Sequence, residues 1–432
     1  MLGILLGAAD DAPEIPPGAI LVADEILPSA FHRLDLSRIA GIVTARGGST
    51  SHAAILAAAR GVPMIVGCGP AVLDLARDTP LLIDFDIPQV LVDPDEAQRL
   101  AFHDRRQRQQ AIDEGQRHAA ATPCRMSDGT RIEVFANCGS LEDTRQAVQR
   151  GAEGCGLLRT EFLFLGREEA PGVDQQAEAY AAVAAALDGR PLIVRTLDAG
   201  SDKPLTYLPL AAEENPALGL RGIRLSLAMP GLLEDQFRAI LKGVPAGQCR
   251  IMLPMVSDLA ELRAARERLR AVEAHLGITA PSPLGIMVET PAAAVMAAAL
   301  AREADFLSIG SNDLAQYALA ADRQNTAFAG TADALHPAVL RLMAMTAEAA
   351  RAHDRWVGLC GAIASEPKAA VLLAGLGIGE LSVAPAMVPA VKAALRHAGM
   401  PQAEALAANA LLQEDAAGVR HIIEEHWHAN GL

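Results

Sequence analysis

From residue 125 onward, short apolar runs alternate with helical segments, and this alternation limits the possible folds more than any other feature. Each run ends in polar residues or glycine before the next helical segment begins. Eight runs are expected to be strands, at residues 132–138, 154–162, 191–200, 250–256, 284–290, 306–313, 356–362 and 380–386. Eight β/α alternations over this length favour a closed, TIM-type (β/α)8 barrel over an open, doubly wound sheet.

Polar residues stand at the carboxyl ends of these runs, which is where (β/α)8 barrels carry their chemistry. Strands that are buried on both faces consist mainly of Val, Ile and Leu, so polar residues in these positions require an explanation. The residues are Asn137, Arg159, Arg195, Asp198, Glu289, Asn312, Asp313 and Cys360. Any one of them could be a rim residue that pairs with a neighbour. Together they predict a functional site on one rim of the barrel.

A smaller unit precedes the barrel. Residues 20–48 are typical of a strand, a helix and a second strand that ends in glycine, and the apolar runs VPMIVG and PLLIDFD continue a compact α/β unit. Residues 95–118 are charged and helical with few core positions, as expected of a solvated connecting helix. We therefore predict an α/β domain at residues 1–94, a helical linker at 95–124 and the barrel at 125–432.

Charge and aromatic content argue against one class of partner. The chain of 432 residues has 52 acidic and 37 basic side chains, a formal charge of −15, and 3% aromatic residues. An acidic surface repels phosphodiester backbones and few rings are present to stack on bases, so we expect no nucleic-acid binding. The apolar stretches are shorter than the ~20 residues of a membrane span, and the N-terminus lacks a basic segment. We expect a cytoplasmic protein without membrane insertion.

One histidine lies in a setting that suits a phosphate. His52 follows Gly47, Gly48 and three hydroxyl residues, and an Ala- and Leu-rich helical segment comes after it. Backbone N–H groups and the positive end of the dipole at a helix start attract phosphate, and glycines permit close approach of the backbone. The same field disfavours imidazolium, so His52 is expected to stay neutral near pH 7. For an isolated S-x-H, a simple helix cap by Ser49 or Thr50 would be the favoured interpretation.

The residues around His52 also carry a family resemblance. GGSTSHAAI, followed by VPMIVG, closely resembles the phosphohistidine domain of the phosphoenolpyruvate (PEP)-utilising family, a small swivelling domain whose histidine carries a phosphoryl group. Six later segments resemble, in the same order, the PEP-binding barrel of enzyme I of the sugar phosphotransferase system. They are GLLRTEFLF, RTLDAGSDKP, ENPALGLRGIR, MVETPAA, SIGSNDLAQYALAADRQN and GLCGAIASEP. The last segment is most similar to the fused, fructose-linked multiphosphoryl transfer proteins.

This resemblance implies a fold and an activity. The fold is a swivelling phosphohistidine α/β domain joined to a TIM-type barrel, and enzyme I implies a homodimer formed through the barrel. The activity is a phosphotransferase reaction in which His52 takes the phosphoryl group of PEP, pyruvate is released, and the group passes to a carrier such as HPr in sugar uptake. The small domain would dock on the barrel mouth and then turn away about the linker.

PEP carries a phosphate and a carboxylate, and planar guanidinium groups match both with paired hydrogen bonds. The candidates for substrate binding are Arg159, Arg195, Arg221 and Arg323, with Asn312 on the phosphate as the family motif implies. Arginines gathered without nearby carboxylates would repel one another, and an anionic ligand would relieve that repulsion.

Two carboxylates are the predicted metal ligands. Glu289 and Asp313 end successive barrel strands, so both can reach one cation and leave positions open for water and substrate oxygens. Oxygen ligands and a phosphorylated substrate indicate Mg²⁺, which keeps waters and prefers about two protein carboxylates. The alternative is that both are unrelated rim carboxylates paired with arginines.

A thiol is the predicted proton donor. Loss of the phosphoryl group leaves the enolate of pyruvate, whose C3 must be protonated, and a group with a pKa of about 8 suits that task. Cys360 in GLCG follows a strand and meets this description once the family resemblance is considered, whereas its sequence context alone favours a structural thiol in a tight turn. The other cysteines, at positions 68, 124, 138, 155 and 249, form no CxxC pair and are expected to be reduced thiols.

Some features depart from enzyme I. The helical domain that docks HPr ahead of the phosphohistidine is not in this sequence, so we expect a fragment of a longer chain or a natural short form. Ala58, Ser201 and Ala362 replace residues that are common in relatives. These departures bear on substrate orientation near Cys360 and on rate, but none removes a metal ligand or the nucleophile.

Three other functions are compatible with parts of the pattern. Pyruvate phosphate dikinase and PEP synthase share the swivelling domain and the barrel, but they need a nucleotide-binding domain, and no glycine-rich phosphate loop is visible. A Mg²⁺-dependent pyruvate aldolase would use a similar barrel without GGSTSH. A catalytically silent regulatory module that can be phosphorylated is the alternative outside the enzymes.

Overall fold

The computed structural model describes most of the chain, at residues 15–26, 34–48, 57, 62–84, 89–200, 205, 207–208, 210–211, 213–322, 325 and 331–429. The chain divides into two compact units, residues 1–111 and 112–432, and the division falls within helix α3 (Glu96–Ala120), in the segment expected to be a connecting helix. His52 and Arg323 lie outside the described residues, as do Ala58 and Ser201.

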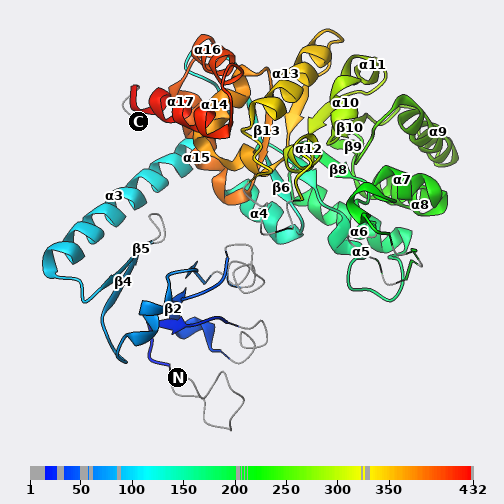
Figure 1. Cartoon of the computed structure of the whole chain (residues 1–432). Coiled ribbons are helices and arrows are strands. Elements are labelled where there is room, and N and C mark those ends of the chain that lie inside the picture. Colours follow the sequence, from blue (N-terminus) through cyan, green and yellow to red (C-terminus); the bar gives the residue numbers. More distant parts are fainter. Residues whose placement is uncertain are drawn as a thin grey trace. The chain divides into compact units, whose positions relative to one another are not determined.

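The first unit contains two small sheets (Figure 1). The parallel sheet has the strand order β1-β2-β3, with β1 at Ala19–Ala23, β2 at Ile39–Thr44 and β3 at Met64–Ile65. The other sheet is an antiparallel pair, β4 (Leu81–Asp84) and β5 (Gln89–Val92). Short 3-10 helices lie at Leu36–Arg38 (η2) and Pro70–Asp74 (η3). Successive side chains of β2 point to opposite faces, so Ile42 and Val43 are buried in two different apolar clusters.

The second unit is a closed barrel of eight parallel strands (Figure 1). The strands are β6 (Glu133–Cys138), β7 (Cys155–Leu158), β8 (Leu192–Arg195), β9 (Cys249–Leu253), β10 (Leu284–Val288), β11 (Leu307–Ile309), β12 (Val357–Leu359) and β13 (Glu380–Val383). β13 pairs with β6, which closes the barrel. Each of the eight predicted runs coincides with or overlaps one strand, so the predicted fold class, a small α/β unit and a (β/α)8 barrel, is confirmed.

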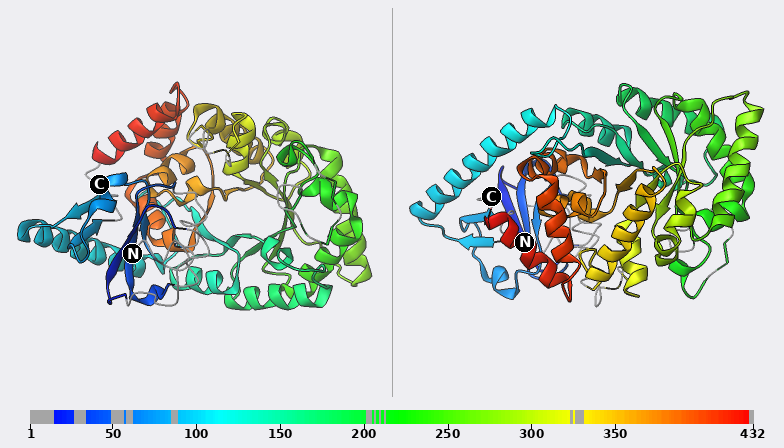
Figure 2. Two further views of the ribbon diagram at one scale, coloured as in Figure 1. Left: turned by 60° about the horizontal axis from the view of Figure 1, so that its bottom comes forward. Right: turned by 90° about the horizontal axis from the view of Figure 1, so that it is seen from above.

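Helices follow the strands and surround the barrel (Figure 2). They are α4 (Leu141–Gln149), α5 (Glu161–Phe164), α6 (Val173–Ala186), α7 (Ile223–Ala228), α8 (Pro230–Gly243), α9 (Leu259–His275), α10 (Pro291–Val295), α11 (Ala297–Ala301), α12 (Ser311–Ala318), α13 (Pro337–Arg351), α14 (Pro367–Gly375), α15 (Val388–His397), α16 (Met400–Ala410) and α17 (Ala416–Ala429). Short 3-10 helices are η4 (Pro216–Leu218), η5 (Ala362–Ser365) and η6 (Pro385–Met387). Ser140 and Asp258 cap α4 and α9, because their side chains accept hydrogen bonds from backbone N–H groups of the first turn.

Successive side chains of a strand point to opposite faces, so the barrel has one apolar core between strands and helices and another inside the ring of strands. Residues of one face, such as Val134, Ile251 and Leu307, belong to the large apolar cluster between strands and helices. A second cluster fills the barrel interior and consists of Leu157, Ile193, Met252, Met287, Phe306 and Cys360, with Trp356 packed against it. Among the described residues, the polar side chains of Ser308, Glu380 and Ser382 are also buried in this interior.

Candidate active site at the carboxyl ends of the barrel strands

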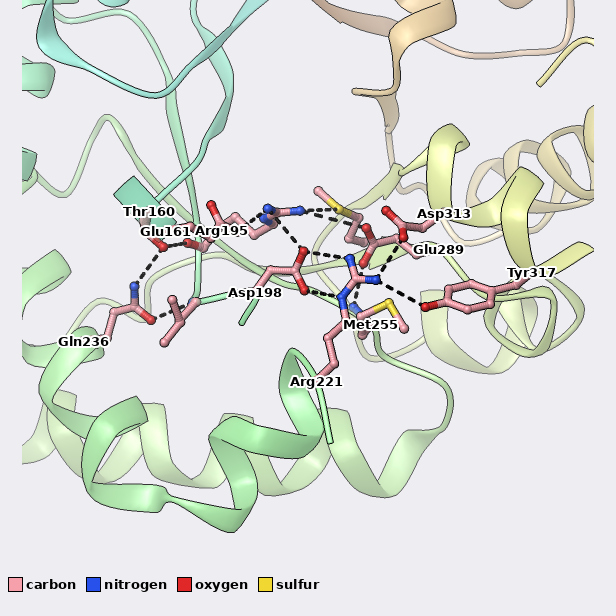
Figure 3. Close-up of polar contacts among 12 residues, drawn as sticks. Thr160, Glu161, Arg195, Asp198, Arg221, Gln236, Met255, Glu289, Asp313 and Tyr317 are labelled. Carbon is pink, nitrogen blue, oxygen red and sulfur yellow. Dashed lines mark hydrogen bonds and ion pairs between the residues drawn. The ribbon is translucent and has the colours of Figure 1, made fainter. Parts of the chain in front are cut away.

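A buried set of charged side chains gathers at one end of the barrel (Figure 3). Arg195 is the last residue of β8, and Asp198 follows three residues later. Glu289 comes directly after β10, and Asp313 lies in the first turn of α12, just after β11. The carboxyl ends of parallel strands meet at one end of a barrel, so these side chains are brought together from distant parts of the chain.

Arg221 links two of the carboxylates. Its Nε and Nη2 donate to the two carboxylate oxygens of Asp198, at 2.9 and 3.0 Å. Its Nη1 donates to Asp313 Oδ1 at 3.1 Å and to the hydroxyl of Tyr317 at 3.3 Å. The residue is 1% exposed, and a two-point contact with a carboxylate fixes the plane of the guanidinium group. Arg221 is therefore held in one orientation within the site.

Arg195 contacts three carboxylates. Its Nη2 is hydrogen-bonded to Glu161 Oε1 and lies 3.4 Å from Asp198 Oδ2, and its Nη1 lies 3.9 Å from Glu289 Oε1. Burial opposes the charge on Arg195, but the three carboxylates outweigh burial and raise its pKa above the ordinary value. Its Nε has no hydrogen-bond partner within the described part of the chain. Arg195 thus keeps one donor for a further acceptor.

Backbone groups near Glu289 bind its carboxylate and leave space for it. The N–H of Met255 donates to Glu289 Oε2 at 2.8 Å. The φ angle of Met255 is +59°, a left-handed conformation that residues other than glycine seldom adopt. Gly310 leaves space for the carboxylate, because a Cβ at this position would lie 2.6 Å from Glu289 Cγ. Both features fix the position of a side chain that is 1% exposed.

The site contains more negative than positive groups. The two arginines contact four carboxylates, which belong to Glu161, Asp198, Glu289 and Asp313. Burial, and then the charges of Asp313 and Asp198, raise the pKa of Glu289 to about 8. Like charges this close need a counter-ion or a proton, so the set fits a divalent cation. The expectation that an anionic ligand compensates unpaired arginines is wrong for Arg195 and Arg221, because carboxylates already pair with them.

The carboxylates alone do not form a complete metal site. Across the described ranges, no group of three or more His, Cys, Asp and Glu side chains is arranged so that it could hold a metal ion. Glu289 and Asp313 nevertheless lie in one network, joined through Arg195, Asp198 and Arg221. A cation that uses only two protein carboxylates fits this arrangement better than one that needs a full cage of side chains.

Two further predicted substrate residues lie at the same end of the barrel. Arg159 comes directly after β7 and is exposed, and its backbone N–H donates to Cys138 O at 2.8 Å. Asn312 Oδ1 accepts a hydrogen bond from the N–H of Ala362 at 2.9 Å. This bond fixes the amide of Asn312 and leaves its NH₂ group as the donor that can face a ligand.

Cys360 is held as a neutral thiol. It is 4% exposed, the Ser308 hydroxyl donates to its Sγ at 3.5 Å, and Asn137 Nδ2 donates to its backbone oxygen at 3.2 Å. Burial is the main cause that raises the pKa of Cys360 to about 12, and the charge of Glu289 adds to it. The expected pKa near 8 is therefore wrong. A thiol with a high pKa stays protonated at neutral pH, which suits a donor of protons better than a nucleophile.

Several residues of the site escaped sequence reasoning. Glu161 and Tyr317 lie within quoted motifs, but nothing in their spacing shows that they contact Arg195 and Arg221. Thr160 Oγ1 donates to Arg195 O at 2.9 Å, and a distant residue, Gln236, donates to that hydroxyl at 3.1 Å. Such contacts depend on the packing of separate elements, which a local pattern does not encode.

Two family models match the chain. The model described as PEP-utilising enzyme, PEP-binding domain, matches residues 113–400, and the model described as PEP-utilising enzyme, mobile domain, matches residues 15–86. The chain belongs to the PEP-utilising enzyme family. The family resemblance inferred from the motifs is confirmed. The buried charged residues Arg195, Asp198, Arg221, Glu289 and Asp313, here called the rim cluster, lie within the segment that the PEP-binding model matches.

The curated relatives are of two kinds, multiphosphoryl transfer proteins and PEP-protein phosphotransferases. A multiphosphoryl transfer protein of Xanthomonas campestris pv. campestris is 47% identical over 95% of this chain and 49% of its own length. PEP-protein phosphotransferases of Haloferax volcanii and Haemophilus influenzae are 44% and 38% identical, over 96% and 98% of this chain and 74% of each relative. The chain spans about half the length of the multiphosphoryl transfer proteins it matches. No helix within the described ranges has both the length and the apolar character to cross a membrane.

Proposed function

We propose that this chain is a PEP-dependent protein phosphotransferase in which His52 takes the phosphoryl group of PEP, pyruvate is released, and a carrier protein of the HPr type receives the group. The observation that carries the proposal is the buried cluster of Arg195, Arg221, Glu289 and Asp313 at the carboxyl end of a PEP-binding barrel. The match of residues 15–86 to the mobile domain, and the names of the relatives, support it.

The anionic groups of PEP would bind to donors at the barrel rim. Arg195 retains an unused Nε–H, and Arg159 is exposed at the same end of the barrel. Arg221 is fixed by Asp198 and Asp313 and presents positive charge to the site, while Arg323 is a substrate residue on the family motif alone. Guanidinium groups bind both phosphate and carboxylate oxygens, so this set suits the two anionic ends of PEP.

Glu289 and Asp313 would hold Mg²⁺. The excess of buried carboxylates over guanidinium groups and the raised pKa of Glu289 both fit a divalent cation. When bound, Mg²⁺ neutralises phosphate charge and stabilises the developing enolate. Met255 and Gly310 keep the Glu289 carboxylate in place for this role, and the Asn312 amide would donate to the phosphate.

The chemical step would proceed at the barrel rim. The neutral imidazole of His52 attacks the phosphorus of PEP, so that an N–P bond forms as the ester P–O bond breaks and the electron pair stays on the enolate oxygen of pyruvate. The Cys360 thiol then donates its proton to C3, so that a C–H bond forms and the S–H bond breaks. Because burial raises the pKa of Cys360 to about 12, the proton is present on Sγ when the enolate arises.

A label-transfer experiment tests this function. The chain is incubated with Mg²⁺ and PEP labelled at phosphorus, and protein-bound label and pyruvate are measured for the wild type and His52→Ala. We expect label on the wild-type protein and none on His52→Ala. Label on His52→Ala, or no label on the wild type, would contradict the proposal. Label from ATP without PEP would instead indicate a dikinase or PEP synthase, and pyruvate consumption with aldehydes an aldolase.

The proposal also covers the cellular location of the protein, its oligomeric state and its partner. We infer a cytoplasmic protein that assembles as a homodimer through its barrel and passes the phosphoryl group to a carrier protein of the HPr type. The family membership supports this inference, because enzyme I is the relative that the motifs resemble. Sedimentation of the purified chain tests the dimer, since a monomer at micromolar concentration would contradict it.

A further inference from the structure

A further buried carboxyl lies inside the barrel, apart from the rim cluster. Glu380 is the first residue of β13 and is 1% exposed. Neither of its carboxyl oxygens has a hydrogen-bond partner in the described part of the chain, nor does the hydroxyl of Ser382 two residues later. Buried polar groups in folded proteins are nearly always hydrogen-bonded, so two unpartnered neighbours in an apolar interior require a functional explanation.

Two glycines make room for the Glu380 carboxyl. A Cβ at Gly358 of β12 would lie 2.0 Å from Glu380 Oε2. A Cβ at Gly156 of β7 would lie 2.5 Å from Glu380 Oε1 and 2.5 Å from Ser382 Oγ. The carboxyl therefore occupies the space that side chains of two strands would otherwise fill, and it lies near the Ser382 hydroxyl. The barrel interior is built around this acid.

A row of residues leads from this carboxyl to Cys360. Ser308, Gly358 and Glu380 are register partners on the neighbouring strands β11, β12 and β13. Gly358 has no side chain, so the Glu380 carboxyl faces Ser308 across it. At about 4.8 Å between neighbouring strands, β11 and β13 lie about 10 Å apart, and the Glu380 carboxyl extends into the space above Gly358 that separates them. A water molecule would bridge the remaining gap to the Ser308 hydroxyl. That hydroxyl lies 3.5 Å from Cys360 Sγ.

We propose that Glu380 is the internal acid that returns a proton to Cys360, through a water molecule and the Ser308 hydroxyl. This inference rests on the proposed function, in which the enolate takes the thiol proton and leaves a thiolate. Ser308 gives its hydroxyl proton to Sγ and takes one from the bridging water, and the water takes the proton of the Glu380 acid. One S–H bond forms, the acid O–H bond breaks, and Glu380 ends as a carboxylate. Glu380 acts only through Cys360 and does not contact the substrate.

The surroundings of Glu380 favour its protonated form. Burial raises the pKa of Glu380 well above its ordinary range, the Glu133 carboxylate raises it further, and Arg250 opposes them. The Arg250 guanidinium lies over the ring of Trp356, 5.1 Å from its centroid. A cavity of about 330 Å³, lined in part by Arg250 and Trp356, is next to this end of the interior. Water there would restore the proton to Glu380 between cycles, and Cys360, directly after β12, is a further titratable group whose charge interacts with that of Glu380.

Exchange between labelled pyruvate and PEP in deuterated water tests the proposal, because it needs no carrier protein. The reverse step returns a methyl proton of pyruvate to the Cys360 thiolate, so solvent deuterium continues to enter C3 of PEP only if the relay re-protonates that thiolate from solvent. The matched control is Glu142→Gln, which makes the same chemical change at an exposed residue of α4, far from Glu380 in the sequence and hydrogen-bonded to Gln146. We expect Glu380→Gln to take phosphoryl from PEP in the first turnover within about twofold of the wild-type rate. The solvent deuterium that enters C3 of PEP per exchange event should fall at least tenfold in Glu380→Gln, whereas Glu142→Gln should match the wild type in both assays.

Other results would overturn the proposal. Deuterium incorporation by Glu380→Gln at the wild-type level would overturn it, and so would an equal fall of first turnover and incorporation, which indicates a structural role. Ser308→Ala, which interrupts the relay and keeps the acid, should likewise take phosphoryl in the first turnover but carry little solvent deuterium to C3 of PEP, even if Glu380→Gln does not fold. Deuterium incorporation by Ser308→Ala at the wild-type level would also overturn the relay. A wild-type chain that takes no phosphoryl from PEP would overturn the proposed function, and this inference with it.

Discussion

At the scale of single residues, Arg221 compensates two buried carboxylates. Arg221→Met removes this cation and leaves Asp198 and Asp313 with one partner fewer in a buried site. We expect the free energy of unfolding to fall by about 3–5 kcal/mol, as when one partner of a buried ion pair is lost. Urea unfolding followed by tryptophan fluorescence measures the change. Arg263→Met, at an exposed ion pair, should unfold near the wild-type urea concentration.

The thiols differ in how accessible and how ionised they are. Cys68 is partly exposed, whereas the other cysteines, Cys360 among them, are buried. Burial raises the pKa of Cys360 to about 12, so almost no thiolate is present at pH 8. We expect iodoacetamide to modify Cys68 in the native protein and to modify Cys360 only after unfolding, as peptide mass spectrometry would show. Rapid native modification of Cys360 would contradict the buried, neutral thiol.

Glu380 predicts a pH dependence of stability. Burial raises the pKa of Glu380 in the folded protein, so above the ordinary pKa of ~4.3 the folded state binds a proton that the unfolded state has released. Stability from this group is present below that pH and is lost as the pH rises towards the folded pKa. Relative to Glu380→Gln, the wild type should lose up to about 1.4 kcal/mol per pH unit over this range. Parallel pH profiles of the two proteins in urea unfolding would show that Glu380 is ionised in the fold.

Parts of the site followed from the sequence and parts did not. Arg195 and Glu289 were recognisable because a charge at the end of an apolar run is unusual in a buried strand. Glu161 and Gln236 were not, because their contacts with Arg195 and Thr160 depend on how separate elements pack against one another. The protonation of Cys360 also escaped prediction, since it depends on burial by residues far away in the sequence.

At the scale of elements, the period of the pattern predicted the strands well, because each apolar run must be buried between helices and the barrel interior. What the pattern did not predict is how α3 is joined to the barrel. Lys392 of α15 is fully buried, and its Nζ donates to the backbone oxygens of Ala120, at the end of α3, and Gly151, at 2.8 and 2.7 Å. It also lies 3.1 Å from Glu153 Oε1.

This lysine should stabilise the end of α3. Lys392→Met leaves the carbonyl groups of Ala120 and Gly151 without their donor, so we expect a loss of about 3 kcal/mol in unfolding free energy. Hydrogen–deuterium exchange of residues 113–124 should quicken more than exchange in the barrel strands. Lys368→Met, which removes an exposed lysine paired with Glu424, is the control and should leave that exchange unchanged. Equal protection of residues 113–124 in Lys392→Met and the wild type would contradict this role.

At the scale of the whole molecule, the proposed chemistry is divided between two units. The cluster that would bind PEP belongs entirely to the second unit, while the proposed nucleophile belongs to the first. A separate domain that carries the nucleophile must approach the substrate and then leave it, so phosphoryl uptake and delivery would be different steps of one cycle. Without an acceptor, the cycle should therefore stop after the first step.

The central claim is that His52 of this chain is the phosphoryl acceptor, and a rapid-quench measurement of pyruvate tests it most directly. With excess PEP and Mg²⁺ but no carrier protein, we predict a single burst of one pyruvate per chain, matched by acid-labile phosphate on the peptide that contains His52. Continuous pyruvate release without phosphate on His52, or phosphate on another residue, would contradict the account.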